Sequence, residues 1–246
     1  MLLQRMRNLA NRVIPEPLRL APVSITLDSG VAIRVDSAVT LGILLELFIT
    51  GPYTSALELA GPMKFVVDLG ANRGLFPLLV EHHLRKSGRP DCPEFLCVEA
   101  AEANYHRLVQ QLSSNGFVGR STAVHGAVCG KRTGTVSFFY TSKRNEAGCI
   151  VNRRSPVTVR CPVADLSALT RNRPIDLLKM DIEGAEEGVL EEYGDVFEKT
   201  GVFVAEFHLH YVDHARCKRL LESRGLRFHE RTWSYQDKLA VEVYAR

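Results

Sequence analysis

Short apolar runs recur along the chain from Phe65 onward, and the stretches between them fit helices. Five of these runs have the length and composition of strands buried in a sheet: Phe65–Val67, Phe95–Val98, Ala123–Val128, Ile175–Asp181 and Val202–His208. Helices are predicted at 75–84, 102–114 and about 212–223. Strands that alternate with helices indicate an α/β fold with a doubly wound, mostly parallel sheet covered on both faces.

Two strand-like runs close the chain, Leu226–Trp233 and Leu239–Ala245, and a short polar turn joins them. They predict a terminal antiparallel hairpin at the edge of the sheet. The sheet would then have seven strands, with an antiparallel C-terminal strand, in a Rossmann-like arrangement. Thr135–Tyr140 alternates apolar and polar positions and predicts an additional strand.

Residues 1–63 are predicted to be an extension of a single domain that spans 64–246. Alternating positions on both sides of the Asp28–Gly30 turn predict a β-hairpin, and residues 40–47 are predicted to be helical. Within 1–14, apolar residues share one helical stripe and the charged residues are arginines. We expect this stretch to pack as a short helix on its own domain; contact with a membrane surface or targeting to an organelle is the alternative.

The composition is that of an ordinary globular chain. The 246 residues are 46% hydrophobic and 24% charged, so a full core can form. The net charge of +3 is too small to require a nucleic acid or an anionic membrane as partner. Six cysteines occur without a C-x-x-C pair, which favours reduced thiols, and no apolar run is long enough to span a bilayer. We therefore expect a soluble, cytoplasmic protein.

The first candidate site follows the first buried strand, in the segment D-L-G-A-N-R-G from Asp68 to Gly74. An acid and then glycines at a strand end, followed by a helix, form the turn that receives nucleotide-like ligands. The spacing is not a complete G-x-G-x-x-G, and an acid there suits the amino group of a cationic ligand better than a pyrophosphate. Glu99 ends the next run, where a carboxylate can accept both hydroxyls of a ribose. Asp68, Gly70, Gly74 and Glu99 together resemble the S-adenosylmethionine site of class I methyltransferases; an ordinary turn with an acidic cap is the alternative.

A second group of charges ends the following strands. In K-M-D-I-E-G, Lys179, Asp181 and Glu183 share one face of the strand and its continuation, because side chains alternate. Lys179 is expected to pair with Asp181 and to lower the pKa of that carboxylate. The same parity places Glu206 and His208 together at the end of the next strand. Parallel strands present their carboxyl ends to the ligand crevice, so we expect these residues beside the first motif.

The segments VDLGANRG, PIDLLKMDIEGAEEGVL and VAEFH together resemble the FkbM family of S-adenosylmethionine-dependent methyltransferases. Members of that family typically methylate hydroxyl groups of sugars, polyketides or other secondary metabolites. The resemblance implies a cofactor turn, a ribose acceptor and a catalytic edge, in that order: Asp68, Gly70, Asn72 and Gly74; Glu99; Lys179, Asp181, Glu183 and Gly184. Ala100 stands where the family usually has proline, which leaves the neighbouring acid in place.

Transfer of a methyl group to an alcohol requires a base near the acceptor oxygen. His208 is the first candidate, because imidazole titrates near neutrality and this residue ends a strand at the crevice. Asp181 is the second candidate or the group that orients the first, Glu206 would hold the imidazole tautomer, and Lys179 and Glu183 complete the predicted catalytic set. A purely structural role for His208 is the alternative. Three nearby histidines, His208, His210 and His214, invite a metal site, but Mg²⁺ favours oxygen ligands and we expect no metal.

The predicted acceptor is a small molecule or glycan with a hydroxyl group. Two alternatives stay open. An RNA methyltransferase would use a basic loop that is otherwise a solvated surface: Lys143, Arg144, Arg153 and Arg154. A cofactor-binding scaffold without catalysis is disfavoured by the joint presence of Asp68, Glu99 and Asp181. The sequence predicts neither the oligomeric state nor the identity of the acceptor.

Overall fold

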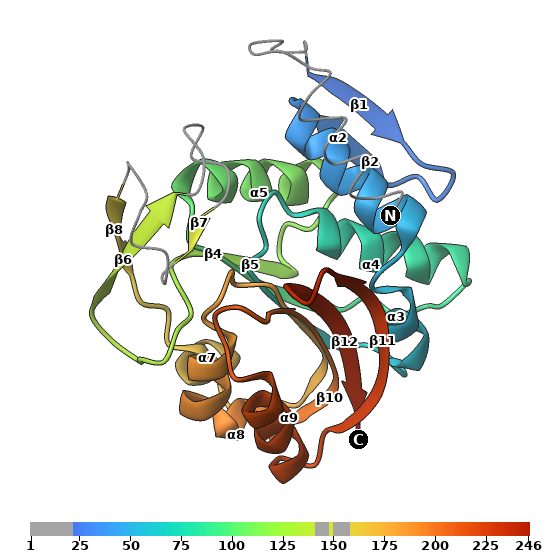
Figure 1. The fold of residues 1–246 in the computed structure, drawn as a ribbon. Coiled ribbons are helices and arrows are strands. Elements are labelled where there is room, and N and C mark those ends of the chain that lie inside the picture. Colours follow the sequence, from blue (N-terminus) through green and yellow to red (C-terminus); the bar gives the residue numbers. More distant parts are fainter. Residues whose placement is uncertain (1–21, 141–147, 150–157) are drawn as a thin grey trace.

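A seven-stranded sheet forms the centre of the molecule (Figure 1). The computed structural model describes residues 22–140, 148–149 and 158–246, so the predictions for residues 1–14 and for the basic loop at 143–154 lie outside the described residues. The strand order is β11-β12-β10-β9-β3-β4-β5. The strands are β3 (Phe65–Leu69), β4 (Glu94–Glu99), β5 (Ser121–His125), β9 (Ile175–Met180), β10 (Thr200–His208), β11 (Arg227–Tyr235) and β12 (Leu239–Ala245).

The pairing of these strands confirms the predicted topology. β3, β4, β5, β9 and β10 pair in parallel, whereas the C-terminal strand β12 runs antiparallel between β10 and β11. Every residue of β3 is buried, as expected for a central strand covered on both faces. Asp68 stands directly opposite Lys179 in the β3–β9 register, so the charged ends of these strands lie at the same edge of the sheet.

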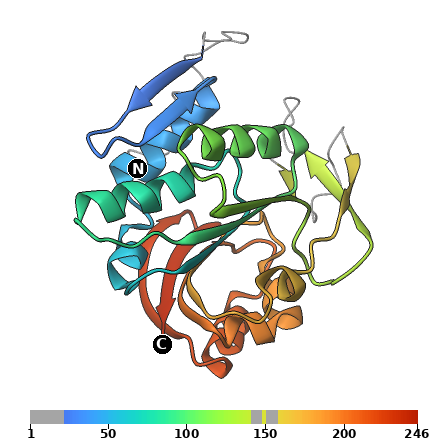
Figure 2. The ribbon, with the colours of Figure 1, turned by 180° about the vertical axis from the view of Figure 1, so that it is seen from behind.

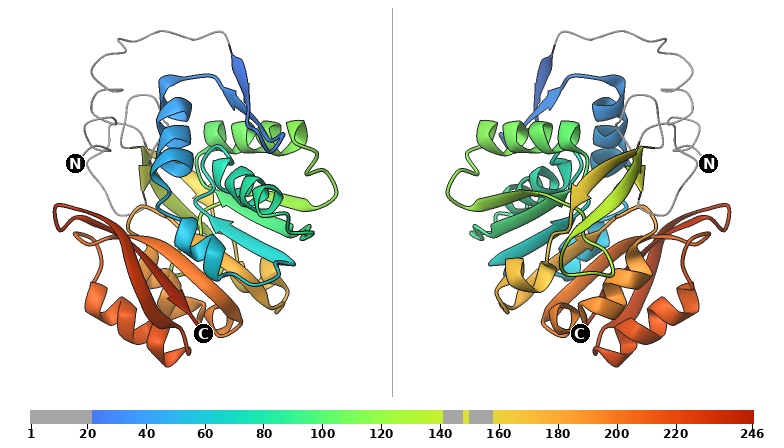
Figure 3. Two further views of the ribbon diagram at one scale, coloured as in Figure 1. Left: turned by 90° about the vertical axis from the view of Figure 1, so that its right-hand side faces the viewer. Right: turned by 90° about the vertical axis from the view of Figure 1, so that its left-hand side faces the viewer.

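Helices cover both faces of the sheet (Figure 3). One face carries α4 (Leu75–Lys86) and α5 (Glu102–Ser114). The other face carries α6 (Leu166–Thr170), α7 (Glu186–Glu192), α8 (Gly194–Phe197) and α9 (His214–Ser223). Each layer has its own apolar cluster against the sheet, which is the doubly wound arrangement that the sequence predicts.

The N-terminal extension packs on the α4–α5 face. Its hairpin consists of β1 (Val23–Thr26) and β2 (Ala32–Val35), as predicted. Helix α2 (Ala38–Leu45) continues into a π-helical turn, η1 (Glu46–Thr50), and a short helix, α3 (Thr54–Leu59), follows. Seen from the front and from behind, the hairpin and α2 lie at the end of the molecule away from α7, α8 and α9 (Figures 1 and 2). The extension shares one hydrophobic core with the sheet, so it is continuous with the domain in its packing.

A second sheet lies beside the first and contains β6 (Thr135–Tyr140), β7 (Gly148–Cys149) and β8 (Thr158–Pro162). The strand predicted at 135–140 therefore forms, but it belongs to this three-stranded antiparallel sheet. The strand predicted at Ala123–Val128 begins earlier, at Ser121, and ends at His125, which leaves Gly126–Val128 for the wall of a pocket. Within the described residues, no helix is long and apolar enough to cross a membrane.

Candidate active site

The turn between β3 and α4 is shaped by two glycines in left-handed backbone conformations. Gly70 has φ +73°, and a Cβ atom there would lie 1.7 Å from the carbonyl oxygen of Asp181. Only glycine therefore lets this turn pass against the end of β9. Gly74, with φ +78°, caps α4, and a Cβ there would lie 2.8 Å from the Leu108 side chain of α5. The two glycines set the shape of the turn through close packing.

Glu99 ties the end of β4 to this turn. Its two carboxylate oxygens accept hydrogen bonds from the backbone amides of Asn72 (2.7 Å) and Ala101 (2.8 Å). Burial raises the pKa of Glu99 to about 7, although these amides and Lys179 act in the opposite direction. The side-chain oxygen of Asn72 is buried and has no hydrogen-bond partner among the described residues. A ligand with hydroxyl or amino donors fits this arrangement, because both residues keep acceptor capacity.

A pocket of about 620 Å³, part of it open to solvent, lies over these residues. Residues from both predicted motifs line it, together with an aromatic residue of the second sheet: Gly70, Asn72, Glu99, Asp181, Glu183 and Phe138. The structure thus brings the two motifs to one cavity. Asp68 and Gly74 do not line the pocket; they hold the turn that forms its wall, through Lys179 and Leu108.

Asp68 is fully buried at the end of β3 and faces Lys179. The Nζ atom of Lys179 lies 3.1 Å from the Asp68 carboxylate, 4.0 Å from that of Asp181, and donates a 2.8 Å hydrogen bond to the carbonyl of Gly70. Lys179 therefore fixes the turn and pairs first with Asp68. The predicted lowering of the Asp181 pKa is wrong: burial raises it, and the attraction of Lys179 does not compensate.

His208 is held between two acids of the following turn and helix. Its Nε2 atom lies 3.1 Å from Glu183, and its Nδ1 atom lies 2.9 Å from Glu186. Burial opposes a charge on the ring, but the hydrogen bonds to these two carboxylates raise the pKa of His208 to about 12. This corrects the expectation that His208 titrates near neutrality. Glu186, which the sequence did not single out, orients the ring in place of Glu206.

Glu183 and Gly184 both adopt left-handed backbone conformations, with φ values of 56° and 102°. This turn directs Glu183 back towards His208, and the amide of Gly184 donates to Glu186 over 2.9 Å. Glu206 is buried beside them, and burial together with the negative charge of Asp181 raises its pKa to about 8. Of the three histidines considered as metal ligands, His210 is exposed and His214 contacts Glu242, so neither joins His208.

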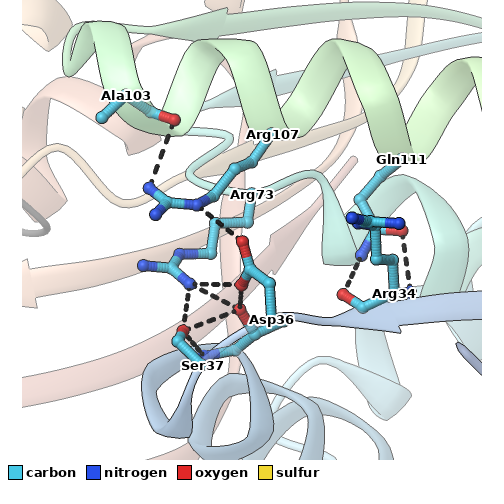
Figure 4. Close-up of polar contacts among 8 residues, drawn as sticks. Arg34, Asp36, Ser37, Arg73, Ala103, Arg107 and Gln111 are labelled. Atoms are coloured by element: carbon cyan, nitrogen blue, oxygen red, sulfur yellow. Dashed lines mark hydrogen bonds and ion pairs between the residues drawn. The ribbon is translucent and has the colours of Figure 1, made fainter. Parts of the chain in front are cut away.

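Arg73 and Tyr53 join the site to the extension, and sequence reasoning missed both. Arg73 is almost completely buried and donates to Asp36, Ser37 and Thr40 at the start of α2. Figure 4 shows its guanidinium beside Asp36, which Arg107 of α5 also contacts. Tyr53 is buried, and burial with the nearby acids at the ends of β9 and β10 raises the pKa of its hydroxyl well above the usual value. One clue to Arg73 was present in the sequence: it is an arginine within the glycine turn, where a charged side chain needs a partner.

The methyltransferase FkbM domain model matches residues 68–228, well over half of the chain. No curated protein matches in sequence. Solved structures that resemble the chain include a protein of the NADB-Rossmann superfamily from Streptococcus agalactiae, with 10% identity, a TM-score of 0.47, and coverage of 79% of this chain and 67% of that chain. Precorrin-6y C5,15-methyltransferase from Geobacter metallireducens has 11% identity, a TM-score of 0.45 and coverage of 80% and 87%. TrmK from M. capricolum, solved with S-adenosylhomocysteine, has 8% identity, a TM-score of 0.44 and coverage of 80% and 67%.

The match over 68–228 includes the glycine turn, the acid that ends β4 and the K-x-D-x-E-G segment that ends β9. These are the segments that form the pocket, and its donor and acceptor groups fit an adenosyl ligand. The chain therefore belongs to the FkbM family of methyltransferases, and S-adenosylmethionine is its cofactor.

Proposed function

We propose that the chain transfers the methyl group of S-adenosylmethionine to a hydroxyl group of a small molecule or glycan. The observation that carries this proposal is the group of carboxylates at the carboxyl ends of β9 and β10, beside the cofactor pocket. Asp181 and Glu183 line the pocket, and Glu206 lies next to them. The raised pKa values of Asp181 and Glu206 bring these carboxylates closer to the strength that a base needs near neutral pH.

The reaction is an in-line displacement. The acceptor oxygen forms a bond to the methyl carbon while the bond from that carbon to sulfur breaks, and S-adenosylhomocysteine leaves. The acceptor proton passes to a carboxylate, for which Asp181 is our first candidate because it lines the pocket. Holding oxygen, carbon and sulfur in line supplies much of the rate enhancement.

The remaining residues position these groups. We propose that Glu99 and Asn72 bind the ribose and that Gly70 admits the cofactor to the backbone. Lys179, held by Asp68, fixes the turn that carries them. His208 acts as a positioning residue that orders Glu183 and Glu186, because a ring between two carboxylates keeps its proton at neutral pH.

A nucleic-acid acceptor is the second candidate, and the charge of the described part of the site disfavours it. The carboxylates that line the pocket, Asp181 and Glu183, would repel a phosphate backbone where they are ionised. The basic loop that would bind RNA lies outside the described residues. The charge of the pocket favours a neutral or cationic acceptor of small size.

The test is a transfer assay with S-adenosylmethionine labelled on the methyl group. Hydroxylated sugars, polyketides and phenols are compared with tRNA and rRNA, and the methylated atom is identified by NMR. We expect an O-methyl product, and Asp181→Asn should lower kcat by about 10²–10⁴-fold while S-adenosylhomocysteine still binds. Label on RNA or on nitrogen, or full activity of Asp181→Asn, would show that the proposal is wrong.

A further inference from the structure

Three side chains at the ends of two neighbouring strands have the geometry of a metal-ligand set. Asp181 follows β9, and Glu206 and His208 end β10, which pairs with β9 in parallel. One ligand atom of each residue lies within 4.8 Å of the corresponding atoms of the other two. Two carboxylates and one imidazole at this separation can share one cation at their centre.

Glu206 lacks the partner that a buried carboxylate needs. It is 7% exposed, and its side chain makes no hydrogen bond or ion pair with any residue that the structure describes. A buried carboxylate without a partner either takes up a proton or coordinates a cation, because an unpaired charge loses its hydration without compensation. Lys179 does not serve, since it is committed to Asp68 and to the carbonyl of Gly70. Glu206 therefore keeps its carboxylate oxygens available for a cation, which would take the place of the proton.

His208 is oriented as metal-binding histidines are. Its Nδ1 atom faces Glu186, which is completely buried and is itself held by the amide of Gly184. A carboxylate on one ring nitrogen fixes the ring and leaves the other nitrogen for the metal. That other nitrogen, Nε2, lies 3.1 Å from Glu183; a cation that binds there replaces the Nε2 proton, which is released to solvent.

We propose that Asp181, Glu206 and His208 bind one divalent cation beside the cofactor pocket. This replaces the expectation from sequence that the chain binds no metal. A mixed set of carboxylate and imidazole ligands suits Mn²⁺, with Mg²⁺ as a weaker alternative. Asp181 lines the pocket, so the cation would lie at its edge.

The role of the cation rests on the proposed function. A divalent cation that binds the acceptor oxygen makes its proton easier to remove and fixes its direction towards the methyl group. With the cation bound, the proton passes to Glu183 instead of Asp181, because Asp181 is then a ligand and Glu183 also lines the pocket. The cation is unchanged at the end of the reaction.

The site is tested by Mn²⁺ binding to the full chain, measured by the loss of the free-ion signal in electron paramagnetic resonance. We expect one Mn²⁺ per chain, displaced by Mg²⁺ in excess. Glu206→Gln and His208→Gln should each weaken binding at least about tenfold, and Glu186→Gln should weaken it about 10–100-fold through the orientation of the ring. Glu94→Gln is the matched control: it removes the same charge from an exposed position at the opposite end of the sheet and should leave binding unchanged.

The proposal is overturned if the wild-type chain binds no Mn²⁺ up to millimolar concentration. It is also overturned if Glu206→Gln, shown to be folded by a cooperative melt and by binding of S-adenosylhomocysteine, keeps full affinity. The two proposals fail separately. If O-methylation persists in EDTA and no Mn²⁺ binds, only the cation site is rejected. If Mn²⁺ binds specifically but no O-methylation occurs, the cation site stands and the proposed acceptor is rejected.

Discussion

Two buried glutamates lie on opposite faces of the same strand pair, and their surroundings differ in charge. Glu242 of β12 stands opposite Ala205, and Glu206 of β10 stands opposite Val241, so the two side chains leave the sheet in opposite directions. Glu242 contacts Arg231, His214 and Lys218, and Tyr244 donates to it. Burial opposes its charge, but these partners lower the pKa of Glu242 to about 2.

Glu206 has the reverse surroundings. Its neighbours include Asp181 and Glu183, and the nearest imidazole is already shared between two other carboxylates. The pKa of Glu206 rises to about 8, whereas that of Glu242 falls. A glutamate that is surrounded by cationic side chains stabilises the fold. A glutamate that is surrounded by other acids is available for a ligand.

Among the variants that test this difference, Glu242→Gln is expected to have the largest effect on stability. Removing the charge leaves Arg231 and its neighbours without their carboxylate, so the free energy of unfolding should fall by about 3 kcal/mol. Urea denaturation at pH 7 measures it. Glu222→Gln, an exposed acid of α9, is the control and should stay within about 0.5 kcal/mol of wild type. A loss below about 1 kcal/mol for Glu242→Gln would show that Glu242 and its cationic partners do not stabilise the fold.

The same carboxylate predicts a pH dependence. Its pKa is lower in the folded chain than the usual 4.5, so the unfolded chain binds the proton more readily. The stability that Glu242 contributes is therefore complete above about pH 4.5 and is lost as the pH falls towards 2. Denaturation midpoints of wild type and Glu242→Gln should converge on acidification; a constant difference between them would contradict this.

Glu99 is intermediate between the two glutamates, because two backbone amides hold it but no cationic side chain among the described residues contacts it directly. With a pKa of about 7 in the free chain, it becomes protonated below neutrality and then loses acceptor capacity for the ribose. We expect the Kd of S-adenosylhomocysteine to rise about fivefold between pH 7 and pH 6 and to approach a tenfold rise per pH unit below that. Titration calorimetry across this range measures it, and Glu99→Gln should give a flat profile with weak binding throughout. Equal pH slopes for the two proteins would show that Glu99 does not bind the ribose.

The ion pairs of Asp36, which join the extension to α5, predict a smaller effect on stability. Arg73 and Arg107 share the carboxylate of Asp36, but Arg73 is 1% exposed and Arg107 is 32% exposed (Figure 4). Arg107→Met should lower the free energy of unfolding by at most about 1 kcal/mol, because Asp36 keeps Arg73 and water screens the lost pair. Thermal denaturation measures it. A much larger loss would mean that Arg107 anchors the extension.

The sequence predicted which residues meet at the site but not how their charges are shared. Strand parity and parallel topology were enough to bring Asp181, Glu206 and His208 together, since both are properties of local pattern. Glu186 could not be predicted as the partner of His208, because the intervening left-handed turn at Glu183 and Gly184 decides where that helix begins.

The parts of the fold that were missed are short or depend on distant contacts. Helix α3 has six residues and β7 has two, too few for a pattern to distinguish them from a loop. Tyr53 and Arg73 acquire their surroundings from segments far away in the chain, and no spacing in one sequence encodes such contacts. The seven-stranded sheet was predictable because its buried strands each have a strong local pattern.

The smallest effect on stability is expected for Glu206→Gln, and it is the sharpest test of the comparison. Although Glu206 is as deeply buried as many structural acids, its carboxylate has no partner among the described residues to lose. In the presence of EDTA we therefore expect its free energy of unfolding to stay within about 0.5 kcal/mol of wild type, or to rise, while Glu242→Gln is clearly destabilised. Urea denaturation of both variants in one buffer measures the contrast. A loss for Glu206→Gln equal to that of Glu242→Gln would mean that the chain itself satisfies Glu206, and the argument for a cationic ligand at the ends of β9 and β10 would then fail.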